Sequence, residues 1–106
     1  MRLTLLLFLL LPAIARSAPS PVEPMRPTKL GLCVACHGDH GISRVPGVPS
    51  LAGQDEAYLK KALGDYRSGA RNVAPMTSFA NTLQPRDIDA LAHWFASQPG
   101  FGKKAP

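Results

Sequence analysis

The segment Cys33-Val34-Ala35-Cys36-His37 constrains this chain more than any other part of its sequence. Two thiols separated by two residues can each form a thioether bond with one vinyl group of a porphyrin, and a histidine directly after them can supply an axial nitrogen to the iron. No other cysteine competes, because the 106 residues contain only these two. The spacing therefore predicts one covalently attached haem per chain, with His37 as an iron ligand.

Paired cysteines have other common uses, which the surrounding sequence makes less favourable. A thioredoxin-like redox pair needs a strand–helix–strand unit, and no convincing alternating apolar pattern occurs here. A zinc site would add His40 to the three residues of the motif, but a histidine adjoining Cys36 departs from ordinary zinc-ligand spacing. A disulfide across two residues closes almost no loop and stabilises little. The haem interpretation is preferred.

Residues 1–15 have the features of a cleaved export signal. Arg2 is followed by a nearly unbroken apolar run over residues 3–11, and Ala13 and Ala15 suit cleavage after Ala15, with Ser17 or Ala18 as less favoured sites. The run is too short to span a bilayer comfortably and no stop-transfer pattern follows, so an uncleaved anchor is the less favoured alternative. We expect a soluble periplasmic protein with no stable membrane insertion, whose remaining chain forms one domain.

The charge balance bears on the partners. Twelve Lys and Arg residues against seven Asp and Glu give a formal charge of +5, which falls by one if Arg2 is removed with the signal. A mild positive excess on an exported protein favours transient docking with acidic redox partner proteins and argues against nucleic acid. The cations expected near an exposed haem edge are Lys60, Lys61, Arg67, Arg71, Lys103 and Lys104.

Proline and glycine positions predict how the chain is divided. Four prolines predict an extended, poorly ordered arm over residues 16–27, and residues 28–106 then form the domain. A short helix is expected from about Pro27 to Cys36 and an ordered loop over 38–53.

The second half of the chain predicts further helices. Asp55 and Gly69 delimit a helix over roughly 56–68, with Tyr58, Leu59, Ala62, Leu63 and Tyr66 as its apolar face. A loop over 69–76 should lead into a short helical turn near 77–81. The last helix should begin at Pro85 and stop before Pro99, with an apolar face of Ile88, Leu91, Ala92 and Phe95. The fold class is therefore all-α.

Met76 is the candidate for the second iron ligand. Beyond the initiator, the only other methionine is Met25, which precedes the haem motif in the arm. Met76 follows Pro75 far enough downstream for the chain to reach the opposite haem face, and His/Met ligation is a standard arrangement. His93 should point to solvent and His40 lies too near the motif, so neither is expected to replace it.

These residues resemble a class I c-type cytochrome, in particular one haem domain of the dihaem cytochromes c of the c-four group and their small single-haem relatives. The resemblance spans Cys33 to Gln98. It is carried by the haem motif with Gly38, Pro49-Ser50-Leu51-Ala52-Gly53-Gln54, Tyr58-Leu59, Arg67-Ser68-Gly69-Ala70-Arg71, Met76 with Leu83, and Asp87-Ile88-Asp89-Ala90-Leu91-Ala92-His93-Trp94-Phe95.

The resemblance implies a small fold of three to four helices around one haem c. It implies that Cys33 and Cys36 form the thioethers, that His37 and Met76 ligate the iron, and that the Pro49 carbonyl accepts a hydrogen bond from the His37 ring. Leu51 should lie against the porphyrin and Trp94 against the helix that enters the motif. The departure from the family is upstream, where Pro24 and Pro27 should shorten the N-terminal helix.

With both axial positions filled, the haem can only exchange electrons, so no catalytic residue is expected and the first hypothesis is a periplasmic electron carrier. The second is a haem c subunit of a larger periplasmic oxidoreductase. The third is a haem sensor or weak peroxidase in which Met76 leaves the iron.

Overall fold

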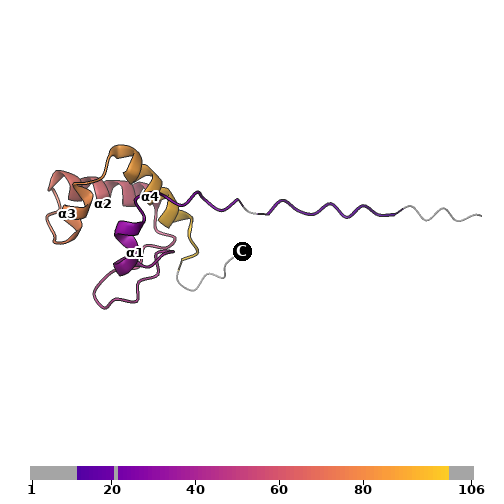
Figure 1. Ribbon diagram of the computed structural model, residues 1–106, viewed down its shortest axis with the longest axis horizontal. Helices are drawn as coiled ribbons and strands as arrows, with labels where there is room; N and C mark the ends of the chain where they lie inside the picture. Colours follow the sequence, from indigo (N-terminus) through magenta and orange to yellow (C-terminus); the bar gives the residue numbers. More distant parts are fainter. Residues whose placement is uncertain (1–11, 21, 101–106) are drawn as a thin grey trace, which may run out of the picture.

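The computed structural model describes residues 12–20 and 22–100, which form four helices and no strand. In chain order these are α1 (Gly31–His37), α2 (Glu56–Ser68), α3 (Met76–Ala80) and α4 (Pro85–Ser97). Figure 1 shows α2, α3 and α4 gathered together, with α1 and the loop that follows it below them. The all-α expectation is confirmed for the described residues.

The predicted export signal falls largely outside the part of the chain that can be described. Residues 1–11 are not described, and Lys103 and Lys104 lie beyond residue 100, so they are not described either. Among the residues that are, no helix is both long enough and apolar enough to cross a bilayer.

The bounds of α2 agree with the sequence. The Asp55 carboxylate accepts a hydrogen bond from the Tyr58 backbone N–H over 2.8 Å, which satisfies one of the donors that a helix start leaves open. Gly69 ends the helix with φ +85°, in the left-handed conformation that glycine adopts without penalty. The predicted apolar face was wrong at one position: Tyr58 is 52% exposed, whereas Leu59 beside it is buried.

The last helix also has the predicted bounds. Pro85 occupies its first turn, and the Asp87 carboxylate accepts a hydrogen bond from the Gln84 backbone N–H over 2.8 Å. Trp94 is buried together with the predicted apolar face, so the buried side of α4 is wider than the sequence pattern indicated.

One hydrophobic core joins the helices. α2 packs against both α3 and α4, and the buried cluster draws on α2, α4, Leu30 before α1 and Leu83 between α3 and α4. Cys33 and Val34 of α1 pack against this cluster from the edge. The buried residues of the cluster are Leu30, Leu59, Leu83, Ile88, Leu91, Ala92, Trp94 and Phe95.

The first helix begins later than predicted. α1 starts at Gly31 and includes His37, while residues 28–30 form a turn. In this turn the Leu30 N–H donates to the Pro27 carbonyl over 3.1 Å, which is the tighter i→i+3 pattern. Pro27 therefore opens a turn that leads into the helix, and the helix itself is one turn shorter than expected.

The loop over residues 38–53 is ordered by its own backbone, as predicted. The Gly41 carbonyl accepts hydrogen bonds from the Leu51 and Ala52 N–H groups over 2.7 and 3.1 Å. Gly41 has φ +81°, and a Cβ atom at this position would lie 2.7 Å from the Ala52 nitrogen. Only glycine therefore lets the two sides of the loop approach this closely.

The arm is extended but not wholly separate from the domain. Its described residues form no helix or strand, and Figure 1 shows residues 12–20 running away from the domain. At its end, the Arg26 guanidinium donates to the Asp39 carboxylate over 2.6 Å and lies 6.0 Å from the centre of the Trp94 ring. The sequence did not indicate this contact.

Candidate haem-attachment site

α1 places the two thiols on one side of a single helical turn. Residues three apart on a helix are neighbours on its surface, so Cys33 and Cys36 project in similar directions. Both thiols are free; Cys33 is half-buried and Cys36 is exposed. Burial raises the pKa of the Cys33 thiol to about 11, so at neutral pH this sulfur is protonated.

His37 ends α1 and has the geometry of an oriented ligand. His37 is only 7% exposed, and its Nδ1 lies 2.8 Å from the Pro49 carbonyl oxygen. Because a carbonyl oxygen can only accept, Nδ1 carries a proton, and in the neutral ring Nε2 is then the nitrogen with the free lone pair. This bond is the one that the resemblance predicted, and it is confirmed.

The other ring nitrogen of His37, Nε2, is not engaged by the described residues. Among the described residues, Nε2 has no hydrogen-bond partner, yet no side-chain nitrogen or oxygen in that part of the chain is both fully buried and unpartnered. Nε2 is therefore not completely enclosed by the described residues. A hydrogen bond on one ring nitrogen that leaves the other open is the arrangement that fixes a metal-binding imidazole.

Two serines hold the loop against the end of α1. The Ser43 hydroxyl donates to the Cys36 carbonyl over 3.0 Å, and the Ser43 N–H donates to the Ser50 hydroxyl over 3.0 Å. These bonds join the end of α1 to the residue directly after Pro49. Serines in loops commonly bond nearby backbone, but nothing in their spacing marked this pair.

Met76 lies on a separate element from the haem motif. The sequence placed it in a loop after Pro75, whereas the structure makes it the first residue of α3, where it is half-buried. The other described methionine, Met25, is 91% exposed in the arm. Met76 thus remains the methionine of the domain, on the segment that joins α2 to α4.

The rival histidines are on the surface, as expected, and are engaged elsewhere. The His93 side chain is 59% exposed, and its Nδ1 lies 3.3 Å from the Glu56 carboxylate; this contact, followed by Lys60, lowers the pKa of Glu56. The His40 side chain is 56% exposed, and its Nδ1 lies 2.9 Å from the Gln98 amide oxygen.

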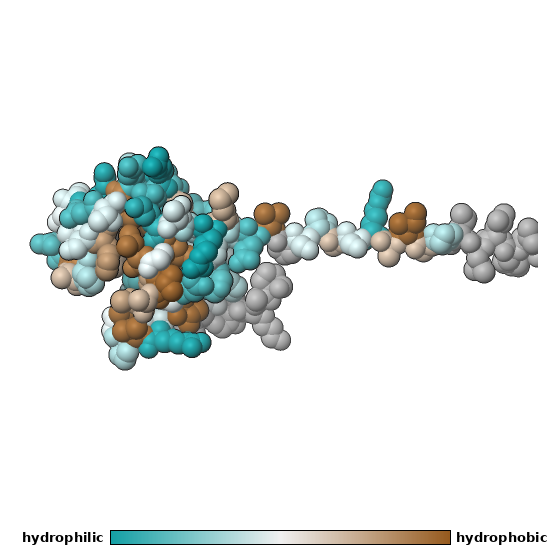
Figure 2. Space-filling model, in the orientation of Figure 1, coloured by the Kyte–Doolittle hydropathy of each residue, from teal (hydrophilic) through white to brown (hydrophobic). Residues whose placement is uncertain are grey.

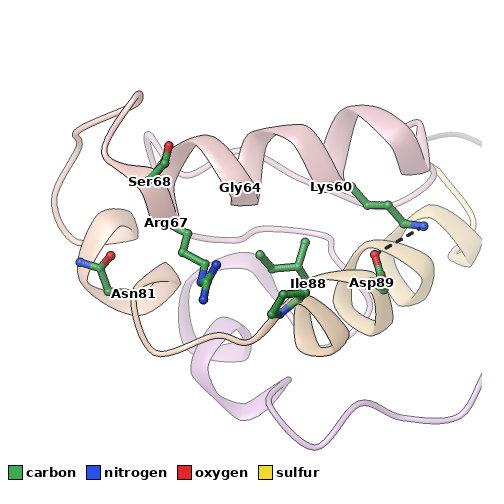
Figure 3. Close-up of a pocket in the computed structure, with 8 residues that line it drawn as sticks. Lys60, Gly64, Arg67, Ser68, Asn81, Ile88 and Asp89 are labelled. Carbon is green, nitrogen blue, oxygen red and sulfur yellow. Dashed lines mark ion pairs between the residues drawn. The ribbon is translucent and has the colours of Figure 1, made fainter.

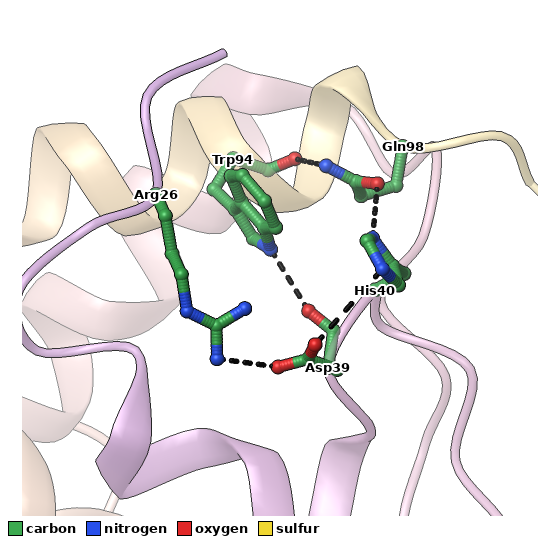
Figure 4. Close-up of polar contacts among 5 residues, drawn as sticks. All are labelled: Arg26, Asp39, His40, Trp94 and Gln98. Carbon is green, nitrogen blue, oxygen red and sulfur yellow. Dashed lines mark hydrogen bonds and ion pairs between the residues drawn. The ribbon is translucent and has the colours of Figure 1, made fainter. Parts of the chain in front are cut away.

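Trp94 connects the end of α4 to the residues that follow the haem motif. Its indole N–H donates to the Asp39 carbonyl over 3.0 Å, and its ring stacks with His40 at a centroid distance of 5.8 Å (Figure 4). Trp94 also shares the core with Leu30 and with Cys33 at its edge. Its printed contacts are with Asp39 and His40, which follow the motif, and its packing against the helix that enters the motif stays a prediction.

The cations of α2 expected near a partner are largely occupied within the chain. A groove of about 480 Å³ lies between α2 and α4, and in Figure 3 Lys60 and Arg67 extend into it. Lys60 pairs with Glu56 and Asp89 over 3.4 and 3.7 Å, and Lys61 pairs with Asp65. The Arg67 Nε donates to the Leu83 carbonyl over 2.8 Å. Much of this charge is therefore compensated locally.

The residues present fit a covalently held porphyrin. Two free thiols lie one helical turn apart, an oriented imidazole leaves one nitrogen accessible, and Figure 2 shows a band of hydrophobic residues over α1 and toward the helices above it. A porphyrin is a large apolar plane, so an apolar surface beside the thiols suits it. An all-helical domain with this site defines the class of proteins that hold haem through cysteine thioethers.

Comparison with known proteins supports the assignment to this class. The family model described as cytochrome c matches residues 30–99. Cytochrome c4 of Pseudomonas aeruginosa is 44% identical over 70 residues, which cover 66% of this chain and 35% of that protein. Cytochrome c-554(548) of Halomonas halodenitrificans is 42% identical, over 66% of this chain and 88% of that protein. The cytochrome subunit of sulfide dehydrogenase of Chlorobaculum tepidum is 32% identical, over 78% of this chain and 76% of that protein.

The chain belongs to the cytochrome c family. Its cofactor is therefore haem c with its iron. The chain spans about a third of the length of the cytochrome c4 that it matches.

Proposed function

We propose that the chain is a periplasmic electron carrier in which Cys33 and Cys36 form thioether bonds with the haem, and His37 and Met76 are the axial ligands of the iron. The export signal over residues 1–15 supports the periplasmic location. The domain that carries the haem would be residues 28–106.

The hydrogen bond from His37 Nδ1 to the Pro49 carbonyl is the observation that carries this proposal. It holds the ring with Nε2 open and makes that nitrogen a stronger donor, as second-sphere bonds to ligating histidines do. A histidine with a purely structural role in the core would not require an unpartnered Nε2, or two free thiols directly before it in the sequence.

Filled axial positions would restrict the haem to exchanging electrons. The haem supplies the redox-active iron, and this chain's residues orient the ring, exclude water and present a surface to partners. A thioether ligand favours the reduced state and so raises the potential. No substrate turnover is expected. Contacts with redox partners would be transient, on faces that complement exposed cations.

A haem c subunit of a larger oxidoreductase is the second candidate. The name of the Chlorobaculum relative, a cytochrome subunit of sulfide dehydrogenase, favours it. The match to nearly the whole of the Halomonas cytochrome favours a protein of single-domain size instead. Affinity purification at physiological salt separates the two: a stoichiometric partner indicates a subunit, and its absence supports a free carrier.

The ligation is tested by optical spectra of the protein matured with the haem-attachment machinery, beside its Met76→Ala variant. The wild type should show the weak far-red sulfur-to-iron band and the variant should lose it. Rapid binding of carbon monoxide by the wild-type ferrous protein would instead favour a sensor or weak peroxidase, in which Met76 leaves the iron. An unchanged band in the variant would remove Met76 from its role.

A further inference from the structure

The segment that carries Met76 is tied to α2 at both ends. On one side, the Arg71 N–H donates to the Asp65 carbonyl over 3.0 Å, and the Arg71 guanidinium lies 4.5 Å from the centre of the Tyr66 ring. On the other side, the Arg67 Nε donates to the Leu83 carbonyl over 2.8 Å. Both ends are therefore held to the helix that packs into the core.

Between these ends, the main-chain bonds around Met76 include those from the Thr77 and Phe79 N–H groups to the Val73 and Pro75 carbonyls, over 3.0 and 3.2 Å. α3 is five residues long, and helices this short are not stable in isolation. The residue before it, Pro75, provides no side chain that caps the helix start. A side-chain hydrogen bond can therefore add to the main-chain bonds that fix the approach of the chain to Met76.

The Thr77 hydroxyl makes that connection. It accepts a hydrogen bond from the Val73 N–H over 3.0 Å, and it lies 3.2 Å from the Arg71 carbonyl and 3.3 Å from the Val73 carbonyl, to which it can donate. One hydroxyl thus uses both its donor and its acceptor on the chain that leads to Met76. Adjacent helical side chains diverge by about 100°, so Thr77 can bind the loop while Met76 projects elsewhere.

We propose that Thr77 is the positioning residue for Met76: its hydroxyl fixes the loop of residues 71–75 and thereby keeps the Met76 sulfur at the iron. This inference rests on the proposed ligation by Met76. Without the hydroxyl, the Val73 N–H loses its partner, and the loop gains conformations in which the sulfur is displaced. Thr77 acts through Met76 and is not itself a ligand.

The chain offers a conservative variant and a matched control. Thr77→Ser keeps the hydroxyl, whereas Thr77→Val removes it at nearly constant volume. Thr82 is the control, because it follows the C-terminal end of α3, whereas the loop precedes the helix, and its hydroxyl donates to the Phe79 carbonyl over 2.7 Å. Thr82→Val therefore removes one hydroxyl from the same segment without touching residues 71–75.

The experiment measures the rate at which carbon monoxide binds the ferrous holoprotein, which requires the sulfur to leave the iron. Thr77→Val should bind about fivefold faster, the factor that one hydrogen bond of ordinary net strength carries. Thr77→Ser and Thr82→Val should bind at the wild-type rate. If Thr77→Val does not take up haem, Thr77→Ala is measured in its place, with the same expectation.

The outcomes separate the inference from the proposed function. A wild-type protein without the far-red sulfur-to-iron band would overturn the ligation by Met76 itself. A wild-type band together with unchanged carbon monoxide binding in the hydroxyl-free variant would overturn the role of Thr77 alone. Equal acceleration in Thr77→Ser or Thr82→Val would also overturn it, because the effect would not then depend on this hydroxyl.

Discussion

The imidazole of His37 donates a hydrogen bond from Nδ1 to the backbone carbonyl of Pro49 over 2.8 Å. The carbonyl belongs to the loop over residues 38–53, and the histidine ends α1, so the orientation of the ring depends on how this loop is held. Gly41, Ser43 and Ser50 supply the bonds that hold it.

The loop predicts different effects for the same substitution at two glycines. Both have a positive φ, +81° at Gly41 and +79° at Gly47, but a Cβ would lie 2.7 Å from the Ala52 nitrogen at Gly41 and meets nothing within 4 Å at Gly47. Gly41→Ala should therefore lower the free energy of unfolding by about 1–3 kcal/mol more than Gly47→Ala, since only Gly41→Ala adds overpacking to the backbone strain. Guanidinium unfolding of the two holoproteins measures the difference, and equal losses would contradict the clash.

Two leucines on either side of the start of α1 predict a second contrast. Leu30 is 0% exposed and Leu32 is 40% exposed. Leu30→Ala should lower the free energy of unfolding by about 2–5 kcal/mol, because it leaves a cavity in the core. Leu32→Ala should cost less than about 1 kcal/mol, since much of its side chain already contacts water. Similar losses in chemical unfolding would mean that Leu30 is not a core residue.

The contact between Arg26 and Asp39 predicts a dependence on pH. The hydrogen bond from Arg26 lowers the pKa of Asp39, so the ionised carboxylate is favoured in the folded protein. The contact should be complete above the ordinary pKa of an aspartate, about 3.9, and should be lost as the pH falls through the lowered value. NMR titration of the Asp39 carboxyl follows this directly.

Variants of arginine test the cause of that shift. Arg26→Ala should raise the pKa of Asp39 toward its ordinary value, whereas Arg44→Ala, an exposed position in the loop, should leave it unchanged. If both variants titrate like the wild type, the ion pair does not form in solution.

The two cysteines should differ in reactivity before haem attachment. With a pKa of about 11, only about one Cys33 thiol in a thousand is ionised at pH 8, and the thiolate is the form that reacts. Cys36 is exposed, so iodoacetamide should modify it first. Peptide mass spectrometry of haem-free protein gives the order, and equal rates at the two positions would indicate that α1 is not folded before the haem is attached.

The sequence predicted the parts of the fold that depend on local signals. Asp55 with Gly69, and Pro85 with Pro99, predicted the bounds of α2 and α4, because capping residues and prolines act on their immediate neighbours. The predictions were wrong where tertiary contacts determine the exposure of a side chain or the start of a helix. Tyr58 fits an apolar stripe but is exposed, and α1 begins after a proline-led turn that ends at the buried Leu30.

The same distinction between local signals and tertiary contacts applies to the haem-attachment site. The haem motif and the Pro49 bond followed from short segments and from a family pattern. The bonds of Ser43 and Ser50 and the contact of Arg26 with Trp94 join residues whose types are common on any surface, so no local pattern marked them. Met76 was expected in a loop, and its place at the start of α3 reflects backbone bonds such as that from Phe79 N–H to the Pro75 carbonyl.

The ion pair between Arg26 and Asp39 brings the end of the arm close to the haem motif, because Asp39 lies two positions after His37. Residues 16–25, if extended at about 3.1 Å each, would reach about 30 Å from this ion pair. A partner that bound the start of the arm could thus keep the haem domain within about this distance without contacting the domain itself.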